Sequence, residues 1–544
     1  MTNVRVLGYV SDERYVAIPD ALVEFESADG TVTVVRSSPR GALHADLSPG
    51  LYRITLSKEG YGSKIVSTSV GSEPYQFRLL SDGLLGYMWP KWVRSGEQAE
   101  FRVHSVEQYQ LSLWRYGLQK ECIGILGWYD EHGPKATVQI TPDGDYTQTG
   151  VQWNKLGYGS PDHTRLIAAP ERGGLYYLWA KTPSGGEFSF PWVVAPSRPQ
   201  SKIAVLAGTN TWNAYNNFGG RSNYVNADRL PNRPIVNARL ELDRYQNPLP
   251  FGVWRPRDEE YAPLSFERPE PHNHLLESGG VTDPVRGRVQ CGQAPGEWRL
   301  LGWLEREGFS YDLYAEAQLH DGTLRLGDYL ALILPLHPEY WTREMYVSVK
   351  RWVFERGGRL LYLGGNGLNC EVILSPEGTM RCLTHVHSLK GEMGGHSISR
   401  PEIEYESRMH RTLESEANLL GVVCSSAGLM TAAPYRVLNR SHWAFDGTSL
   451  RNGDLFGKNT LHERVPGGAS GHETDKRSAS SPVNTVLLAR GINPENGGAE
   501  VVYHEPGGGG AVFSVGSMTW VAGLLVDEHL SRITRNVLER FLHD

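Results

Sequence analysis

The sequence predicts a multidomain chain in which two β-sandwich domains precede a doubly wound, mostly parallel α/β domain. Up to about residue 198, apolar residues recur at every second position, as in half-buried strands. Beyond it, continuous apolar runs alternate with segments of helical spacing, which indicates buried parallel strands joined by helices. Between these regions lies the segment APSRPQSK, residues 195–202, whose Pro and Ser content is typical of a linker.

Residues 1–80 predict the first sandwich. The runs VRVLGYV, ALVEFES, TVTVVRS, LYRITLS and KIVSTSV have period two and are separated by Gly, Asp and Pro turns. The stretch LSPGLYRITLSKEGY resembles the small prealbumin-like sandwiches that are often appended to enzymes, so we expect a scaffold here. Residues 81–198 continue the pattern with AEFRVHSV, YQLSLWRYG, ATVQITP, LYYLWAKT and FSFPWVVAP, which predicts a second sandwich of immunoglobulin type.

Residues 199–544 predict the α/β domain. The runs KIAVLAG, YLALILPLH and RLLYLGGN are buried strands, and EWRLLGWLEREGF and TREMYVSVKRWVFERGG have helical spacing. TVLLARG, AVFSVGS and HLSRITRNVLERFLHD add two strands and a closing helix. In such sheets ligands bind beyond the carboxyl ends of the strands, so the informative residues are those that directly follow them.

Composition excludes several classes of partner. A net charge of −7 and a pI near 6.2 argue against nucleic acid or an anionic membrane. The longest apolar run, residues 329–336, is too short to span a bilayer, and the N-terminus lacks the pattern of a signal peptide. The five cysteines are scattered without a CxxC pair, which favours a reducing compartment. We therefore expect a cytoplasmic protein.

Polar residues gather where the predicted strands end. The stretch NTWNAYNNFGGRSNY, residues 210–224, follows the first strand and is rich in Asn and Tyr. Two further strands end in LHPEYW and GGNGLN, and GASGHETD forms a Gly-rich loop. The polar residues of these three segments are His337, Glu339, Asn366, His472 and Glu473. If the α/β prediction holds, all of these loops converge on one crevice.

Familiar nucleophile motifs are absent from these loops. No GxSxG elbow occurs, which argues against a serine hydrolase of that type. The scaffold resembles that of class I glutamine amidotransferases, whose catalytic Cys would lie in the turn GGNGLN, but that turn has no thiol. Cys370 lies three residues too late, and we interpret it as a buried structural thiol.

An oxygen-rich metal site remains. His337 and Glu339 are two residues apart on extended chain, so their side chains point the same way. A carboxylate combined with tyrosine phenolates is a hard, anionic ligand set. Such a set suits Fe(III) better than Zn(II), which prefers His and Cys.

Five segments resemble a known family when they are taken in order. TWNAYNNFGGRSNY, WLEREGFSYDLYAEAQLH, LPLHPEYWTREM, LGGN and SGHETD resemble the C-terminal domain of the N,N-dimethylformamidase large subunit, over residues 200–544. The resemblance implies a mononuclear iron amidohydrolase with one Fe(III) per chain, held by two tyrosines and one glutamate. It implies cleavage of the C–N bond of a small N-substituted amide, such as a formamide, by metal-activated water.

The resemblance assigns metal ligands residue by residue. It places the glutamate at Glu339 in HPEYW and the first tyrosine at Tyr215 in NAYNN, with Tyr224 as a rival. Relatives carry the second tyrosine directly after RP in an SF-x-RP segment. Here SFERPEPH has Glu270 in that place, so Tyr261, just upstream in RDEEYAPLSF, is the candidate replacement.

It also assigns catalytic roles. Glu473 becomes the general base and proton shuttle together with His337, and Asn366 donates a hydrogen bond to the developing oxyanion. The expected substrate-binding residues are Trp212, Asn216 and Phe218. A lysine expected downstream of GGN has no clean counterpart, and the candidates for its place are Lys390 and His385.

Each of these residues also has a structural interpretation. Tyr215 could simply pack its ring, Glu339 could cap the helix that follows it, and Asn366 could serve a left-handed turn. His337 could orient Glu339 without taking part in catalysis.

Other functions stay open as well. One is a hydrolase of a larger amide, urea or carbamate on the same iron scaffold. Another is a carbohydrate-binding or carbohydrate-active protein, which would use two carboxylates flanking a cleft. A third is a non-catalytic binding protein. We expect a homo-oligomer. The resemblance implies that the family enzyme also pairs with a small second subunit. Because this chain carries two compact β domains instead, we do not assume such a subunit for it.

Overall fold

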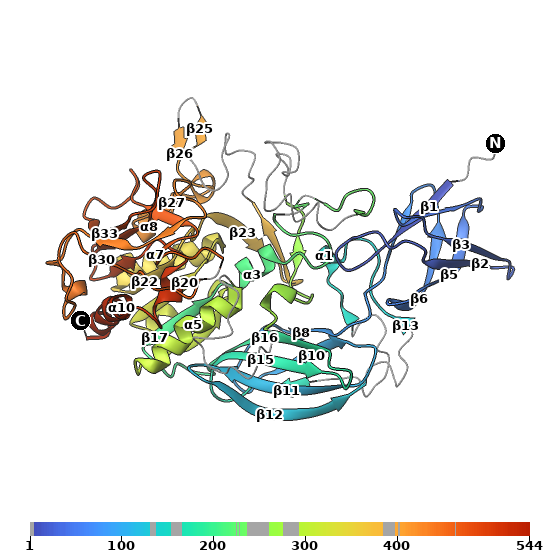
Figure 1. Ribbon diagram of the computed structural model, residues 1–544, viewed down its shortest axis with the longest axis horizontal. Helices are drawn as coiled ribbons and strands as arrows, with labels where there is room; N and C mark the ends of the chain where they lie inside the picture. The colour runs from blue at the N-terminus through green and yellow to red at the C-terminus, as the bar shows by residue number, and fades with distance from the viewer. Residues whose placement is uncertain are drawn as a thin grey trace.

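The computed structural model describes residues 5–130, 138–153, 166–224, 226–227, 229–236, 261–275, 293–383, 398–400, 403–462 and 464–543 (Figure 1). Two residues considered in place of a family lysine, His385 and Lys390, lie outside this range.

The N-terminal strands form two sheets around one apolar cluster, as their alternation predicts. One sheet has the order β4-β1-β7 and consists of β1 (Arg5–Ser11), β4 (Ala42–Ala45) and β7 (Tyr75–Arg78). The other has the order β13-β6-β5-β2-β3 and consists of β2 (Leu22–Ser27), β3 (Val32–Arg36), β5 (Gly50–Lys58), β6 (Gly62–Val70) and β13 (Val138–Gln139). Because β13 pairs with β6, a strand of the second predicted domain extends the sheet of the first.

The next region also has two sheets with a shared core, which includes Phe101, Leu178 and Trp192. The first, of order β14-β10-β8, consists of β8 (Leu85–Trp89), β10 (Gln98–His104) and β14 (Leu166–Ala168). The second, of order β12-β11-β15-β16-β9, consists of β9 (Trp92–Arg94), β11 (Tyr109–Tyr116), β12 (Lys120–Tyr129), β15 (Gly174–Lys181) and β16 (Glu187–Ala195). The short helix α1 (Tyr146–Thr149) precedes β14.

The third region is built on a nine-stranded sheet of order β19-β17-β20-β22-β35-β34-β33-β29-β30. Its strands are β17 (Ile203–Ala207), β19 (Asp312–Ala315), β20 (Ala331–Leu336), β22 (Arg359–Gly364), β29 (Tyr435–Val437), β30 (Leu455–Phe456), β33 (Val486–Gly491), β34 (Glu500–His504) and β35 (Ala511–Ser514). The parallel prediction is confirmed from β19 to β35. The pairings from β35 through β34, β33 and β29 to β30 are antiparallel, and short hairpins join β33 to β34 and β34 to β35.

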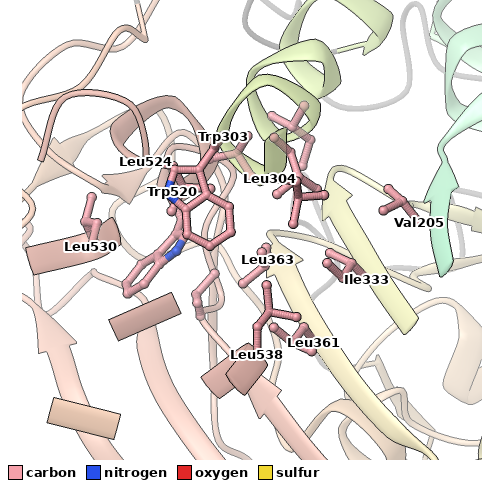
Figure 2. Close-up of a cluster of buried hydrophobic side chains, with 14 of the residues drawn as sticks. Val205, Trp303, Leu304, Ile333, Leu361, Leu363, Trp520, Leu524, Leu530 and Leu538 are labelled. Carbon is pink, nitrogen blue, oxygen red and sulfur yellow. The ribbon is translucent and has the colours of Figure 1, made fainter. Parts of the chain in front are cut away.

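Helices cover both faces of this sheet. The helices α5 (Gln293–Arg306), α9 (Trp520–Gly523) and α10 (Glu528–His543) pack on one face, where Trp303, Trp520 and Leu538 meet apolar side chains of the strands (Figure 2). On the other face lies α7 (Arg343–Arg356), with Val349 and Trp352 in a second cluster. Thr342 caps α7 by accepting a hydrogen bond from the Met345 amide, and Gly357 ends it at φ 72°.

Shorter elements complete the region. A four-stranded sheet of order β18-β24-β23-β21 consists of β18 (Leu264–Ser265), β21 (Tyr340–Trp341), β23 (Cys370–Leu374) and β24 (Thr379–Cys382). Three strand pairs are β25 (Ile398–Arg400) with β26 (Ile403–Tyr405), β27 (Val423–Ser425) with β32 (Thr474–Lys476), and β28 (Ala432–Ala433) with β31 (Ser470–Gly471). The remaining helices are α3 (Thr209–Tyr215), α6 (Glu316–His320), α8 (Ala417–Leu420) and the 3₁₀ turns Pro271–Asn273, Leu326–Asp328, Met409–Arg411 and Trp443–Phe445.

Two features of this region bear on function. The chain leaves β17 for β19 on one side and returns to β20 on the other, so β17 marks the switch point of the sheet. In open α/β sheets such a point opens a crevice at the carboxyl ends of the strands. Of the helices within the described ranges, none is long and apolar enough to cross a membrane.

Candidate active site

The helix α3 follows β17 at this switch point and is fixed by its own polar side chains. The Asn210 side chain donates to the Tyr340 carbonyl at 3.0 Å, and that of Asn213 donates to the Leu264 carbonyl at 3.1 Å. The Trp212 indole donates to Oε1 of Glu297 at 3.0 Å. The side chains of these asparagines therefore satisfy main-chain carbonyls of neighbouring segments, and they fix α3, which ends at Tyr215.

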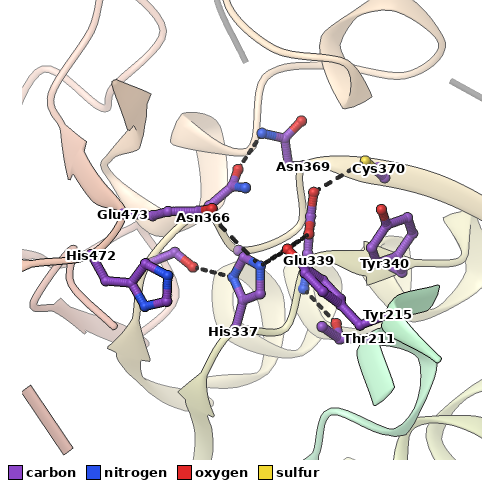
Figure 3. A network of polar contacts seen from close by, with 12 residues as sticks. Thr211, Tyr215, His337, Glu339, Tyr340, Asn366, Asn369, Cys370, His472 and Glu473 are labelled. Atoms are coloured by element: carbon purple, nitrogen blue, oxygen red, sulfur yellow. Dashed lines mark hydrogen bonds and ion pairs between the residues drawn. The ribbon is translucent and has the colours of Figure 1, made fainter. Parts of the chain in front are cut away.

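One carboxylate oxygen is the centre of the site. Oε2 of Glu339 accepts hydrogen bonds from the hydroxyls of Tyr215 at 3.1 Å (Figure 3) and Tyr224 at 2.6 Å. Nε2 of His337 lies 3.0 Å from the same oxygen and 2.9 Å from the Tyr215 hydroxyl. The rings of Tyr215 and Tyr224 stack with centroids 4.2 Å apart. Segments far apart in sequence thus meet at a single atom.

His337 follows β20 and is held from behind. Nδ1 donates to the Gly365 carbonyl at 2.9 Å, which leaves Nε2 facing Glu339. Burial alone would lower the pKa of His337, but the charges of Glu473 and Glu339 outweigh it and raise this pKa to about 9. The pKa of Glu339 is lowered in turn, because its contacts with His337 and the charge of Arg408 outweigh burial.

Glu473 lies on the other side of His337. Its Oε2 is 3.8 Å from Nε2 of His337 and has no hydrogen-bond partner. Burial, the largest effect, raises the pKa of this carboxyl. Asn366 has the left-handed conformation of a turn residue, φ 49°, and its side chain hydrogen-bonds Glu473. In the structure Asn366 therefore contacts Glu473, which makes it a positioning residue for that carboxylate.

A guanidinium that the sequence does not reveal lies behind the carboxylate. Nη1 of Arg408 is 3.7 Å from Oε1 of Glu339 and donates to Sγ of Cys370 at 3.2 Å. Sγ of Cys370 lies 3.7 Å from the same Oε1. Cys370 is fully buried, as expected, but it touches the site. No motif surrounds Arg408, so nothing in the sequence could have indicated its position.

The loop that joins Tyr215 to Tyr224 is shaped by one buried side chain. The guanidinium of Arg268 donates to the carbonyls of Asn213, Asn216, Phe218, Arg221 and, through Nε, Ser265. Within the loop, Gly219 and Gly220 have φ of 100° and 92°. A Cβ at Gly220 would lie 2.4 Å from Cβ of Tyr15, so only glycine allows the loop to pack on the N-terminal region.

Comparison with known proteins gives the family. A family model described as "N,N-dimethylformamidase beta subunit-like, C-terminal" matches residues 126–532. This chain belongs to that family. Its relatives include the N,N-dimethylformamidase beta subunit of Paracoccus aminophilus, 28% identical over 509 residues, which cover 83% of this chain and 58% of that protein.

The beta subunit of Alcaligenes sp is 27% identical over 296 residues, which cover 46% of this chain and 37% of that protein. The chain thus spans about half the length of the curated relatives it matches. Two solved structures show only faint likeness. A DUF3823 family protein from Bacteroides ovatus has a TM-score of 0.13 at 10% identity and covers 34% of this chain and 97% of that chain. The Bacillus anthracis TIE protein has a TM-score of 0.12 at 13% identity and covers 37% of this chain and 34% of that chain.

The structure brings some of the metal ligands that the family resemblance implies together at Glu339, and it places the others elsewhere. Tyr215, its rival Tyr224 and Glu339 come together as described above. Tyr261 is buried in the same apolar cluster. Glu270, which stands where dimethylformamidase relatives carry tyrosine, instead pairs with Lys91 at 2.5 Å. The hydrogen bonds described above bring Tyr224, together with Tyr215, to Glu339.

The expected substrate-binding residues lie in structural surroundings. Trp212 packs in the sheet core and is bound to Glu297. The Asn216 side chain donates to the Pro269 carbonyl at 2.8 Å and accepts from the Phe218 amide at 3.1 Å. Phe218 packs in another cluster with Tyr146. Each of the three is at most 4% exposed.

The donor atoms at Glu339 fit the iron that the resemblance to the dimethylformamidase family implies. Within the described ranges no group of three or more His, Cys, Asp and Glu is arranged to hold a metal, so a metal here needs phenolate oxygen. Burial and the charge of Glu339 raise the pKa of Tyr224 well above its usual range. Such a phenol ionises only beside a strong positive charge. Two phenolates and a carboxylate match a hard trivalent cation.

Proposed function

We propose that this chain is a dimethylformamidase-like hydrolase that cleaves the C–N bond of a small N-substituted amide, such as a formamide. One observation carries the proposal: two phenols and an imidazole converge on Oε2 of Glu339, directly beside the carboxylate of Glu473. Membership of the family, and the names of its relatives, support an amide as the substrate.

We propose that Tyr215, Tyr224 and Glu339 hold one Fe(III) per chain. Bound there, the ion would act as a Lewis acid toward the amide carbonyl and make water a stronger nucleophile. Arg408 and His337 compensate the negative charge of Glu339 and keep it ionised for this task. Tyr340 donates to the Tyr224 hydroxyl at 2.8 Å and so orients that phenol.

The remaining residues handle protons. Glu473 takes the proton of the attacking water and passes it to the departing amine, for which its raised pKa suits neutral pH. Asn366 holds this carboxylate in place, and His337 lies between Glu473 and Glu339. A larger amide, urea or carbamate would use the same residues, with specificity set by the pocket.

The carbohydrate hypothesis is less well supported. Its two carboxylates would be Glu339 and Glu473, with the sugar between them. In the structure Nε2 of His337 lies between them, 3.0 Å from one and 3.8 Å from the other. Glu339 is also only 2% exposed, which leaves it out of reach of a sugar ring.

Assembly and location complete the proposal. The relatives are named as subunits, which supports a complex of several chains, and we propose a homo-oligomer with room for a further subunit. The described cysteines Cys122, Cys370, Cys382 and Cys424 are all free thiols, which supports a reducing, cytoplasmic environment.

The test combines metal analysis with turnover. The purified protein should contain about one iron per chain, show a visible tyrosinate charge-transfer band, and release dimethylamine from N,N-dimethylformamide. Tyr215→Phe should shift or abolish the band. Protein reconstituted with iron that shows no such band and hydrolyses no N-substituted amide would refute the proposal.

A further inference from the structure

Two histidines that the proposed chemistry leaves unused lie beside Glu473. His472 directly precedes Glu473, and its Nδ1 is 3.2 Å from Nε2 of His462. The two residues are 7% and 1% exposed. His472 has φ 67°, a conformation uncommon for residues other than glycine. Two backbone hydrogen bonds to the residues just before β28 hold it there. The His472 amide donates to the Thr431 carbonyl, and the Met430 amide donates to the His472 carbonyl.

The protons on this pair can be assigned from its partners. The amide of Val465 donates to Nδ1 of His462 at 3.1 Å, and a backbone amide can only donate. Nδ1 of His462 therefore carries no proton, and a neutral ring must carry it on Nε2. This Nε2–H donates to Nδ1 of His472, so the proton of the His472 ring is on its own Nε2.

Both rings are neutral at physiological pH. Burial, helped by the charges of Arg299 and Arg464, lowers the pKa of His462 to about 3. Burial also lowers the pKa of His472 well below its usual range, and the nearby His462, Arg464 and His337 add to the effect. Neutrality follows independently from the geometry, since Nδ1 of His462 and Nδ1 of His472 both act as acceptors.

The His472 ring lies beside the site. Figure 3 shows it on the side of His337 where Glu473 lies, and the charge of His337 helps to lower the pKa of His472. In the part of the chain that the structure describes, the recorded hydrogen bond of the His472 ring is the one through Nδ1. The Asn366 amide, by contrast, contacts Glu473. A neutral imidazole of low basicity can polarise a carbonyl without losing its proton.

We propose that His472 donates its Nε2–H to the carbonyl oxygen of the bound amide, and that His462 is a positioning residue that fixes this donating tautomer. The identity of the acceptor, an amide carbonyl, rests on the proposed function. The tautomer of His472 does not depend on it. It gives His472 the oxyanion-stabilising role that the sequence had suggested for Asn366.

Variants at position 472 separate a donor from a structural residue. The amide nitrogen of Gln reaches the place of Nε2, whereas that of Asn reaches only the place of Nδ1. Asn adopts the left-handed conformation more readily, so a purely structural role predicts that His472→Asn is the better tolerated variant. The donor role predicts the reverse: His472→Gln keeps kcat/KM for N,N-dimethylformamide within about threefold, and His472→Asn lowers it roughly 100-fold.

Position 462 tests the relay. His462→Gln keeps a donor toward Nδ1 of His472, and His462→Leu removes it. We expect a loss of kcat/KM only in the Leu variant, with matched thermal midpoints confirming that both fold. ¹⁵N NMR of histidine-labelled wild type, with His472 assigned from its absence in His472→Gln, should show a protonated Nε2 and a bare Nδ1 at pH 7.

The outcomes distinguish this inference from the proposed function. An Nδ1–H tautomer or an imidazolium at His472 overturns it, whatever the activity. Equal loss in His472→Gln and His472→Asn of an active enzyme overturns the donor role. If the wild type carries the expected tautomer but hydrolyses no amide, the proposed function fails and with it the amide as acceptor, while the fixed tautomer stands.

Discussion

Tyr224 donates its hydroxyl to Oε2 of Glu339 at 2.6 Å, although 115 positions separate the two residues. The same hydroxyl accepts a hydrogen bond from Tyr340 at 2.8 Å. Its oxygen is thus fixed by a donor on one side and an acceptor on the other, closer to Glu339 than the hydroxyl of Tyr215 at 3.1 Å. This arrangement makes Tyr224 the first residue to test in the ligand set.

Tyr224→Phe should remove most of the bound iron and of the tyrosinate band, because it deletes one of the two phenols that we propose as ligands. Tyr261→Phe is the matched variant, since Tyr261 lies in the same apolar cluster. We expect it to keep the band. Metal analysis and a visible spectrum of both proteins decide the matter, and loss of the band in Tyr261→Phe alone would return Tyr261 to the ligand set.

Glu473→Gln should lower kcat by roughly 10²–10⁴-fold while the iron content stays at the wild-type level. The amide cannot accept a proton from water, but it keeps the shape and the contact with Asn366. Steady-state kinetics together with iron analysis test this. Full activity in this variant would exclude Glu473 as the general base.

Lys91→Met should strongly destabilise the protein. Lys91 and Glu270 form a buried pair, 2.5 Å apart and 8% and 3% exposed, and removal of the cation leaves an uncompensated carboxylate. The cost of breaking such a pair is about 3–5 kcal/mol. The double variant Lys91→Met/Glu270→Gln should recover a large part of that loss. Denaturant unfolding of the wild type, the single variants Lys91→Met and Glu270→Gln and the double variant measures the coupling energy between the two residues. Additive changes in the free energy of unfolding would contradict the prediction.

Stability should fall as pH rises from about 4.5 to about 8, in part because of Glu297. Burial raises the pKa of this carboxyl to about 8, although it accepts hydrogen bonds from Gly208 and Trp212. In this window the folded protein keeps the proton and the unfolded chain releases it, so each pH unit costs up to about 1.4 kcal/mol. Below the window both states are protonated.

Glu297→Gln should flatten that dependence, since the amide keeps both acceptor contacts and does not titrate. Urea denaturation of wild type and variant at several pH values between 4.5 and 8 gives the two slopes. The same slope in both proteins would mean that Glu297 is ionised in the folded state.

The predictable part of the fold is the part with a clear period. The runs that became β17, β20 and β22 were predicted as parallel strands, and they are. The antiparallel half was not predicted. β34 is buried along its whole length, and its centre, Val501–Tyr503, is as continuously apolar as a short parallel strand. Only its pairing partners distinguish the two.

For the site, the position of a residue relative to the predicted strands indicated which residues lie together, whereas its type alone did not. His337, Glu339 and Glu473 were expected together because each follows a strand or loop at one edge of the sheet, and both glutamates have an oxygen within 3.8 Å of Nε2 of His337. Trp212 and Phe218 have the composition of a pocket wall but fill cores. Periodicity cannot separate these cases in an irregular segment, because it carries no information about which neighbours surround a side chain.

The guanidinium of Arg268 binds main-chain carbonyls of the loop between the two phenols, and every amino acid supplies the same carbonyl. The course of the loop is therefore largely independent of the side chains it carries, apart from its paired glycines. A substitution at an exposed position such as Asn217 should therefore leave Tyr215 and Tyr224 in place.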